Sequence, residues 1–460
     1  MTDSAQATHE VEIDNSNRST TPQTSTFADY ISQNWAERAD TLPAELPVAA
    51  HAAVRRRTLG ALFPGERIVI AAGAMKQRSN DTFYPFRPHS AFAHLTGWGT
   101  DSEPGAILVL DPVGESHEAT LYFRERAGRD SDEFFANPEI GEFWIGPRPS
   151  LGQVAAALGV RTAHLAEFVA ADGDRTLDDA DLARAASELR LVKDAYELAE
   201  MQAAVDATAQ GFTEVLAALP AASAHPRGER IVEGVFNQRA RLDGNTVGYE
   251  TIAASGPHAC TLHWIRNDGP VRAGDLLLLD AGVELDSLYT ADITRTVPVS
   301  GTFSEVQRRV YDAVLEAADA ARAIVRPGIR FGDVHDAAMR VIEARTREWG
   351  LLPEDDGTAY YRRYMVHGTS HHLGMDVHDC AQARREMYMD GILEPGMVFT
   401  IEPGLYFQPD DLTVPEEFRG IGVRIEDDIV VTEDGCVNLS ADIPRTAADV
   451  EAWIRAAQSA

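Results

Sequence analysis

The sequence is poor in cysteine and lacks any long apolar run. Three cysteines, Cys260, Cys380 and Cys436, occur among 460 residues without a CxxC spacing, so at most one disulfide can form. Runs of about 18 apolar residues, which a transmembrane helix requires, do not occur. The polar segment 1–25 also lacks the basic and then apolar pattern of a secretory signal. We therefore expect a cytoplasmic protein in a reducing compartment, without a membrane partner.

Basic charge is also scarce. The chain has 41 Lys and Arg residues against 72 Asp and Glu residues, which gives a formal charge of −31 at pH 7. Nucleic acids and anionic membranes bind to basic surfaces, so neither is an expected partner. The hydrophobic share of 44% is that of an ordinary globular protein, and 460 residues suffice for two or three domains with their own cores.

The expected elements divide the chain into a tail and two domains. Residues 1–26 are rich in Ser, Thr, Asn and Gln, which predicts a disordered tail. Strands and helices alternate over residues 27–187, which predicts a small N-terminal α/β domain. Asp194 and Glu197 form a capping-box pattern that begins the first long helix of the second domain, 188–460. Helices of this second domain are expected at 194–219, 228–242, 304–325 and 331–349.

Two acids flank a predicted β-hairpin in the second domain. The apolar run 276–279 ends in Asp280, and Asp292 enters a β-branched run at 293–297. With a turn near Asp286, the two acids are expected to lie directly opposite each other, with Cβ atoms roughly 4.5–5.5 Å apart. Carboxylates at that spacing repel each other unless a cation lies between them. A divalent cation is the simplest explanation, and two solvated acids at strand ends are the alternative.

Later segments add further candidate ligands. A core strand ends in Glu402 before a Pro-Gly pair, and strand alternation over 420–431 places Arg424 and Glu426 on one face. A lone histidine is usually a core or surface residue, but a dense cluster beside glycines favours a functional site. The clustered histidines are His367, His371, His372 and His378.

Four acids and one histidine can therefore form a metal site. Four ionised carboxylates carry about four negative charges, which two divalent cations neutralise. Buried charges without such compensation cost several kcal/mol each. A ligand set rich in oxygen favours Mn²⁺, Mg²⁺, Fe²⁺ or Co²⁺ over a sulfur-rich zinc site, and carboxylate bridges give the two-metal spacing of roughly 3.5–4 Å.

Five short segments carry a more specific pattern: Asp280-Ala-Gly, Thr290-Ala-Asp292-Ile-Thr-Arg-Thr, His367-Gly-Thr-Ser-His371-His-Leu-Gly-Met-Asp-Val-His378, Ile401-Glu402-Pro-Gly and Arg424-Ile-Glu426-Asp. With them, the sequence resembles the Xaa-Pro aminopeptidases (aminopeptidase P), over about residues 30–440. These enzymes are pita-bread metallopeptidases, as are prolidase and methionine aminopeptidase. The resemblance implies a pseudo-symmetric pita-bread catalytic domain after a small N-terminal α/β domain. Methionine aminopeptidase lacks such an N-terminal domain, so it is disfavoured.

The resemblance also implies a ligand set for two divalent metal ions, with Mn²⁺ the expected ion. Asp292 and Glu426 are implied to bridge the two ions, and Asp280 to complete one site. His371 and Glu402 are implied to complete the other site. Glu402 is also the expected general base.

Residues around the ions are assigned by the same resemblance. His263 and His378 are implied to hold the substrate and to stabilise the tetrahedral intermediate. His367 lies in the pocket wall, where substrate binding and a structural role are both open. Arg424 is implied to orient the metal-binding carboxylates and to offset part of their charge.

We therefore expect an aminopeptidase that removes the first residue from peptides with proline in second position, assembled as a homodimer or homotetramer. A prolidase that hydrolyses X-Pro dipeptides is the main alternative. A metal-free relative acting on a small amidine such as creatine, and an inactive binding scaffold, are two others. The complete set of five expected ligands argues against both of these.

Overall fold

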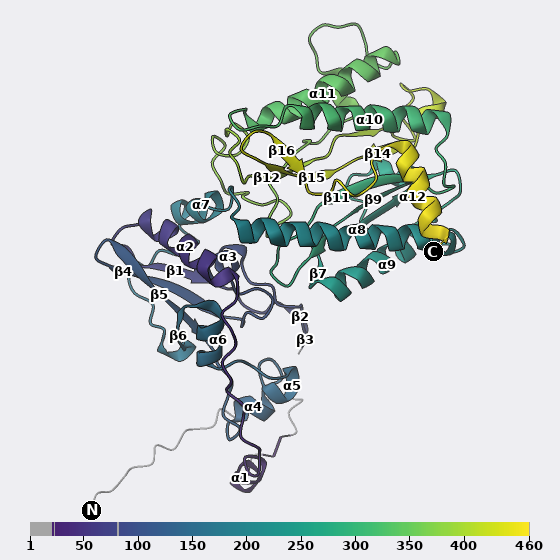
Figure 1. Ribbon diagram of the computed structural model, residues 1–460. Coiled ribbons are helices and arrows are strands. Elements are labelled where there is room, and N and C mark those ends of the chain that lie inside the picture. Colours follow the sequence, from purple (N-terminus) through teal and green to yellow (C-terminus); the bar gives the residue numbers. More distant parts are fainter. Residues whose placement is uncertain (1–20, 23, 81, 460) are drawn as a thin grey trace, which may run out of the picture. The chain divides into compact units, whose positions relative to one another are not determined.

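The computed structural model describes residues 21–22, 24–80 and 82–459 (Figure 1). The chain forms two compact units. The first comprises the described residues up to Trp98 together with Ser102–Thr176, and the second comprises Gly99–Asp101 and the described residues from Leu177 onward. The tail expected at 1–26 lies largely outside the described residues, and the domain boundary expected after residue 187 stays a prediction.

The first unit is built on a four-stranded sheet with the strand order β1-β4-β5-β6. The first three strands pair antiparallel, and β6 pairs parallel with β5. Its strands are β1 (Ile68–Ala71), β2 (Gln77–Ser79), β3 (Thr82–Phe83), β4 (Ile107–Val113), β5 (Ser116–Phe123) and β6 (Arg161–His164). Its helices are α1 (Ser25–Ile31), α2 (Val48–Ala61), α3 (Ser90–Thr96), α4 (Asp132–Ala136), α5 (Glu142–Ile145), α6 (Leu151–Leu158) and the 3₁₀ turn η1 (Leu165–Glu167).

The second unit places its strands between two helix pairs, α8/α9 and α10/α11 (Figure 1). Its helices are α7 (Ala180–Glu188), α8 (Ala195–Ser223), α9 (Gly228–Asp243), α10 (Glu305–Ala323), α11 (Phe331–Glu348) and α12 (Ala447–Ser459), with the 3₁₀ turns η2 (Gly256–Cys260), η3 (Tyr360–Arg363) and η4 (Glu416–Phe418). Its strands are β7 (Thr246–Val247), β8 (Ile252–Ser255), β9 (Leu276–Ala281), β10 (Val283–Glu284), β11 (Ile293–Pro298), β12 (Val398–Ile401), β13 (Gly404–Tyr406), β14 (Gly422–Arg424), β15 (Asp427–Val431) and β16 (Cys436–Asn438). The main sheets have the orders β11-β9-β8 and β12-β15-β16.

Local signals fix the long helices. The Asp194 side chain accepts hydrogen bonds from the first-turn backbone of α8, and the Glu197 carboxylate accepts from the Asp194 backbone N–H at 2.9 Å, as the capping box predicts. The helix continues past the expected end at residue 219 and includes Pro220. A proline has no N–H to donate to the carbonyl four residues earlier, which here is that of Leu216. The Gln458 side chain of α12 donates to that oxygen at 3.4 Å, so the carbonyl stays paired.

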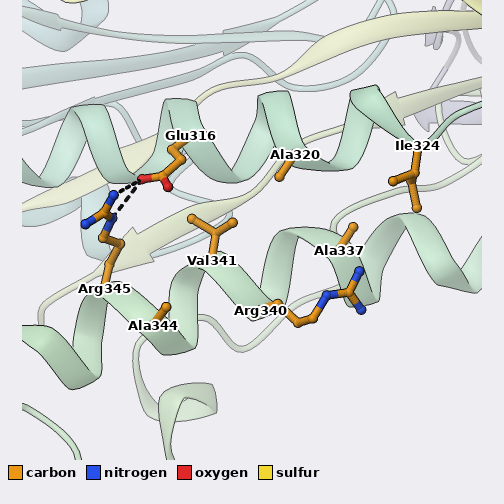
Figure 2. Close-up of a pocket in the computed structure, with 8 residues that line it drawn as sticks. All are labelled: Glu316, Ala320, Ile324, Ala337, Arg340, Val341, Ala344 and Arg345. Carbon is orange, nitrogen blue, oxygen red and sulfur yellow. Dashed lines mark hydrogen bonds and ion pairs between the residues drawn. The ribbon is translucent and has the colours of Figure 1, made fainter.

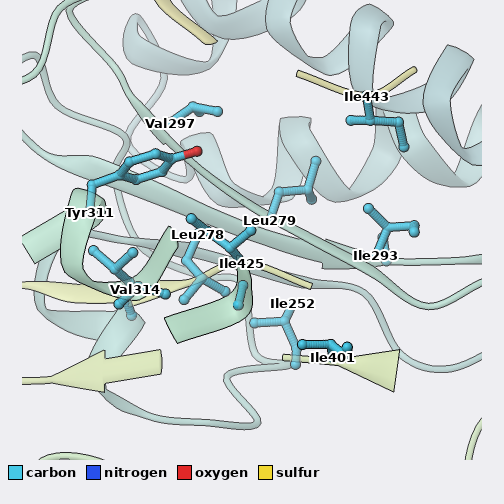
Figure 3. Close-up of a cluster of buried hydrophobic side chains, with 14 of the residues drawn as sticks. Ile252, Leu278, Leu279, Ile293, Val297, Tyr311, Val314, Ile401, Ile425 and Ile443 are labelled. Atoms are coloured by element: carbon cyan, nitrogen blue, oxygen red, sulfur yellow. The ribbon is translucent and has the colours of Figure 1, made fainter. Parts of the chain in front are cut away.

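The core of the second unit lies around β9 and β11, where every residue is buried. Figure 3 shows Leu278, Ile293 and Val314 in this cluster, contributed by β9, β11 and α10. A sheet covered on both faces needs apolar side chains at successive positions, which explains the unbroken run at 276–279. Acids placed at the ends of such strands therefore lie inside the protein. Within the described ranges, no helix has the length and apolar character needed to cross a membrane.

The expected register of the hairpin is wrong by two residues. Asp280 pairs with Thr294, so Asp292 is its diagonal neighbour on the same face and does not lie opposite it. The hairpin continues through β10, where Glu284 bridges Thr290, while the other edge of β10 pairs with β7. The chain reverses at 285–289: the Leu285 N–H donates to the Tyr289 carbonyl at 2.9 Å, and Leu288 has a φ of 73°. The turn is thus centred on Ser287 and not on Asp286, and this shift of one residue changes the pairing by two.

Gly282 lies between β9 and β10, at a point of the hairpin where no side chain fits. A Cβ atom at this position would lie 1.8 Å from the carbonyl oxygen of Ala291, and backbone cannot yield as a side chain can. We predict that Gly282→Ala lowers the free energy of unfolding by roughly 1–3 kcal/mol, as overpacking does elsewhere. Urea denaturation followed by circular dichroism measures it.

The matched control is Gly234→Ala in α9, where an added Cβ meets no atom within 4 Å. Replacing an exposed helical glycine by alanine raises stability by roughly 0.5–1 kcal/mol. Equal unfolding free energies for Gly282→Ala and the native protein would contradict the close approach.

Candidate functional site

Strand ends carry the four expected acidic ligands to one place in the second unit. Asp280 is the penultimate residue of β9, and Asp292 directly precedes β11. Glu402 directly follows β12, and Glu426 lies between β14 and β15. Asp280, Asp292 and Glu426 are 7%, 5% and 1% exposed, so this negative charge is buried. His371 arrives from the irregular segment between η3 and β12.

The ligand atoms are close enough to share cations. Asp292, His371 and Glu426 each offer an atom within 4.8 Å of the others. The Nε2 atom of His371 is 3.2 Å from Asp292 Oδ2 and 3.6 Å from Glu402 Oε1. Asp280 joins the group through Tyr249, whose hydroxyl lies 2.7 Å from Asp280 Oδ1 and also within hydrogen-bond distance of Asp292 Oδ1, so its one proton is shared between the two acids. All five expected ligands therefore belong to one cluster.

The electrostatics of the cluster call for positive charge. Burial, with the nearby charges of Asp292 and Asp280, raises the pKa of Glu402 to about 7. Burial and the same acidic neighbours raise the pKa of Glu426 well above its usual value. Burial lowers the pKa of His371, but the Asp292 hydrogen bond and the Glu402 charge outweigh it and raise that pKa to about 9. Without metal, the cluster therefore reduces its negative charge by binding protons. Divalent cations could take the place of those protons, because the donor atoms are carboxylate oxygens and an imidazole nitrogen.

Arg424 links the acids to the wall of the site. Its guanidinium pairs with Asp280, and its Nε donates at 3.1 Å to the hydroxyl of Thr294. That hydroxyl donates in turn to Glu426 Oε2 at 2.6 Å. A third Arg424 nitrogen donates to the Tyr406 hydroxyl at 3.1 Å. The arginine therefore fixes two of the acids and offsets part of their charge.

Two of the expected non-ligand histidines, His367 and His378, lie beside the cluster. The Nε2 atom of His367 is 2.7 Å from the Tyr406 hydroxyl, and its Nδ1 is 3.6 Å from Glu402. Burial and the Arg424 charge lower the pKa of His367 to about 3, so it is neutral. The His378 ring packs edge-on against His371 with centroids 4.3 Å apart, and burial lowers its pKa too.

His263 is exposed, on the segment between η2 and β9. Its charge contributes to the lowered pKa of His378, so the two histidines lie within electrostatic range of each other. The structure therefore places His378 against the acidic cluster through His371, with the exposed His263 close enough to influence His378.

A buried carboxylate fixes the segment that carries His371 and His378. Asp379 forms ion pairs with Arg190 at 3.0 Å and with Lys193 at 3.1 Å. Although burial raises the pKa of a carboxyl group, these two cations hold the pKa of Asp379 below its usual value. Its backbone N–H donates to the His372 carbonyl at 2.9 Å, which closes the loop between the two histidines.

Sequence reasoning missed Tyr249 and Asp428. Tyr249 follows a glycine in an irregular segment, and no local pattern marks its hydroxyl as a partner of two acids. Asp428 is fully buried behind Asp292 and accepts from its backbone N–H at 3.2 Å. Asp427 and Asp428 begin β15 directly after Glu426, and this run of three acids before an apolar strand was the available signal, because buried acids are unusual.

A separate hollow lies between α10 and α11, lined by residues such as Ala320, Val341 and the Arg345–Glu316 ion pair (Figure 2). None of the expected site residues is among its lining residues. Small alanine side chains between the two helices account for the space. The chemistry therefore lies with the acidic cluster.

Comparisons with known proteins agree on one group of relatives. Residues 199–433 match the model of metallopeptidase family M24, and residues 51–179 match the model of the aminopeptidase P N-terminal domain. Xaa-Pro aminopeptidase 1 of Streptomyces coelicolor is 50% identical, with 94% of this chain and 92% of the relative covered. Xaa-Pro aminopeptidase 2 of the same organism is 53% identical, with 91% and 94% covered.

Solved structures of aminopeptidases resemble this chain over most of its length. The aminopeptidase PepP of Pseudomonas aeruginosa superposes with a TM-score of 0.77 at 31% identity, covering 91% of this chain and all of that one. Aminopeptidase P from Escherichia coli in its low pH form gives a TM-score of 0.76 at 31% identity, covering 90% and 99%. The expected pita-bread fold with its additional N-terminal domain is thereby confirmed.

The proton content of the cluster yields a prediction. Metal ligands bind in their deprotonated forms, whereas His371, with a pKa of about 9, is protonated at pH 7 and Glu402, with a pKa of about 7, is half protonated. Adding Mn²⁺ to the metal-free protein at pH 7 should release roughly one to two protons. Titration calorimetry in two buffers of different ionisation enthalpy measures this number.

His371→Ala should release fewer protons, while His225→Ala, which changes an exposed histidine at the end of α8, should match the native protein. A heat of binding that is the same in both buffers would show that no protons are released and would contradict the prediction.

Proposed function

This chain belongs to metallopeptidase family M24 and, within it, to the Xaa-Pro aminopeptidases, and we propose below how its own residues carry out the reaction. It is a metallo-aminopeptidase that removes the first residue from peptides with proline in second position, and it is not a prolidase. Divalent metal ions are its cofactors. One observation carries the assignment of residues: four acids and a histidine converge in the core with too little positive charge to hold them ionised.

We propose that these five residues hold two ions, with Mn²⁺ as the native metal. Asp292 and Glu426 would serve both ions, Asp280 would complete one set of ligands, and His371 and Glu402 would complete the other. The closeness of Asp292, His371 and Glu426 and the oxygen-rich donor set support this arrangement. When bound, the ions supply Lewis acidity and lower the pKa of an attacking water.

Glu402 serves as the general base. Its carboxylate lies in the cluster, with Oε1 3.6 Å from His371 Nε2, so it is placed to accept a proton from a water held there. The pKa of the neighbouring His367 is lowered to about 3, so its imidazole is too weak a base to compete for the proton of the water. Arg424 keeps Asp280 and, through Thr294, Glu426 in place while the proton moves.

His263 and His378 hold the substrate carbonyl and stabilise the negative charge that develops on its oxygen. The lowered pKa of His378 leaves it neutral at pH 7, with one ring N–H to donate to that oxygen. The X-Pro amide has no N–H, so the enzyme cannot recognise its substrate through that group. Recognition therefore depends on the carbonyl oxygen, on the proline ring and on the free amino terminus.

We propose that residues 27–187 form the N-terminal domain and residues 188–460 the catalytic domain, and that the protein works as a cytoplasmic homo-oligomer, a dimer or a tetramer. The match of residues 51–179 to the aminopeptidase P N-terminal domain supports the division. The thiols of Cys260, Cys380 and Cys436 are all free, as a reducing compartment requires.

Peptide length and the second residue test the substrate assignment. The Mn²⁺-loaded protein is assayed with Ala-Pro-Ala, Ala-Pro and Ala-Ala-Ala, and release of the first alanine is quantified. We predict cleavage of Ala-Pro-Ala at a kcat/KM that is roughly 100-fold or more above that of the other two peptides. Cleavage of the dipeptide alone would instead identify a prolidase, and Mn²⁺ binding without any hydrolysis would identify a scaffold.

The ligand assignment is tested at Asp292, the proposed bridge. We predict that Asp292→Ala folds but loses bound metal and more than about 100-fold in kcat/KM, beyond the tenfold to 100-fold cost of changing an outer partner of a metal ligand. Metal analysis and the Ala-Pro-Ala assay measure both effects. Asp286→Ala, in the same hairpin connection, should retain both properties, and near-normal turnover by Asp292→Ala would remove the bridging role.

A further inference from the structure

A second buried carboxylate, outside the metal-binding cluster, receives an unusual number of hydrogen bonds. Glu229 lies in the first turn of α9 and is fully buried. Its Oε1 accepts from the Ser255 backbone N–H at 2.9 Å and from His258 Nδ1 at 2.7 Å. Its Oε2 accepts from Trp264 Nε1 at 3.0 Å and from the Gly269 backbone N–H at 2.6 Å. A carboxylate has about four lone-pair sites, so Glu229 is saturated.

All four donors belong to one segment, 255–269. Ser255 and Gly269 are its two ends, so the carboxylate ties the ends together. The backbone N–H of Glu229 also donates to the Gly269 carbonyl at 3.1 Å. Glu229 thus closes this segment into a loop on the N-terminus of α9.

The other two donors hold the inside of the loop. The rings of His258 and Trp264 stack with centroids 3.8 Å apart and an angle of 23° between their planes. Each ring donates to a different oxygen of Glu229, so the carboxylate fixes both partners of the stack. Because a carboxylate only accepts, His258 carries its proton on Nδ1.

His263 is adjacent to Trp264 but has little support of its own. Its side chain is exposed, and two short-range backbone hydrogen bonds lie beside it: Thr261 N–H donates to the His258 carbonyl at 2.9 Å, and Ile265 N–H donates to the His263 carbonyl at 3.0 Å. Its two neighbours, Leu262 and Trp264, both pack against the core, and Trp264 is the one that Glu229 holds.

We propose that Glu229 is a positioning residue for the aminopeptidase reaction, which sets the place of His263 at the substrate through the indole of Trp264. This inference rests on the substrate-binding role proposed for His263. Glu229 does not touch the substrate and contributes no metal ligand. Its hydrogen bonds with Trp264 and Gly269 hold the part of the segment that follows η2, which has no regular secondary structure of its own.

Glu229→Gln is the sharpest variant, because it preserves shape but not accepting capacity. The amide of glutamine has one accepting oxygen, so in either orientation its NH₂ group faces two N–H donors. Misplacing a reacting group by about 1 Å can cost about 100-fold, so we expect kcat/KM for Ala-Pro-Ala to fall roughly 10- to 100-fold. Bound metal should remain at the native level.

A double-variant cycle separates positioning from general destabilisation. If Glu229 acts through His263, the His263→Ala/Glu229→Gln double variant should be within about twofold of His263→Ala alone. Trp264→Phe, which keeps a ring but removes the donor to Glu229, should show the same lack of further effect on His263→Ala. It also provides the test if Glu229→Gln does not fold.

Trp453→Phe is the matched control, because Trp453 donates its indole N–H to Thr213 at 3.2 Å between α12 and α8. It should keep kcat/KM within about twofold of the native value. Multiplying losses in the double variant, or a fully active Glu229→Gln, would overturn the inference. Full activity of His263→Ala would overturn it together with the role of His263, whereas a native protein inactive on Ala-Pro-Ala would refute the proposed function itself.

Discussion

Mutual repulsion among buried acids is the constraint on which the second unit depends. Asp280, Asp292, Glu402 and Glu426 come from different strand ends, and each is surrounded by protein and by the other acids. Such a group exists only if protons or cations reduce its charge, and the raised pKa values show that the protein alone uses protons. Divalent cations would remove the same repulsion and leave all four carboxylates ionised, which is why the cluster fits the metal cofactors of this family.

The neighbours of the acids make the geometry rigid before any ion binds. Tyr249 holds Asp280 and Asp292 at a fixed separation, and Arg424 with Thr294 ties Asp280 to Glu426. Each link is a hydrogen bond to a charged group in a dry interior, where such bonds are strong and their loss is costly. A pre-positioned ligand set loses little conformational freedom on binding cations, so less of the binding energy is spent on ordering side chains.

How far the sequence predicted this depends on the range of the interactions. The helices α8, α9, α10 and α11 lie within a few residues of their expected bounds, because caps and periodicity are local signals. The four acids were chosen as candidate ligands because each lies at the end of a strand in a family-specific motif, and the structure brings them together; their role as ligands stays a prediction. The hairpin register was wrong by two residues, since the turn is centred on Ser287 with Leu288 in the left-handed region, and no local pattern marks that position. Tyr249 was missed for the same reason: its partners are set by tertiary packing.

The two histidines proposed to hold the substrate are supported in opposite ways. The segment of His378 is tied by Asp379, whose charge is balanced by Arg190 and Lys193. The segment of His263 is tied by Glu229 through neutral N–H donors and a stacked ring pair. An X-Pro bond offers no N–H, so binding depends on accurate hydrogen bonds to the carbonyl oxygen. The side chains proposed to donate them lie outside regular secondary structure. Buried carboxylates that bind a loop at several points provide that accuracy without adding charge at the metal centre.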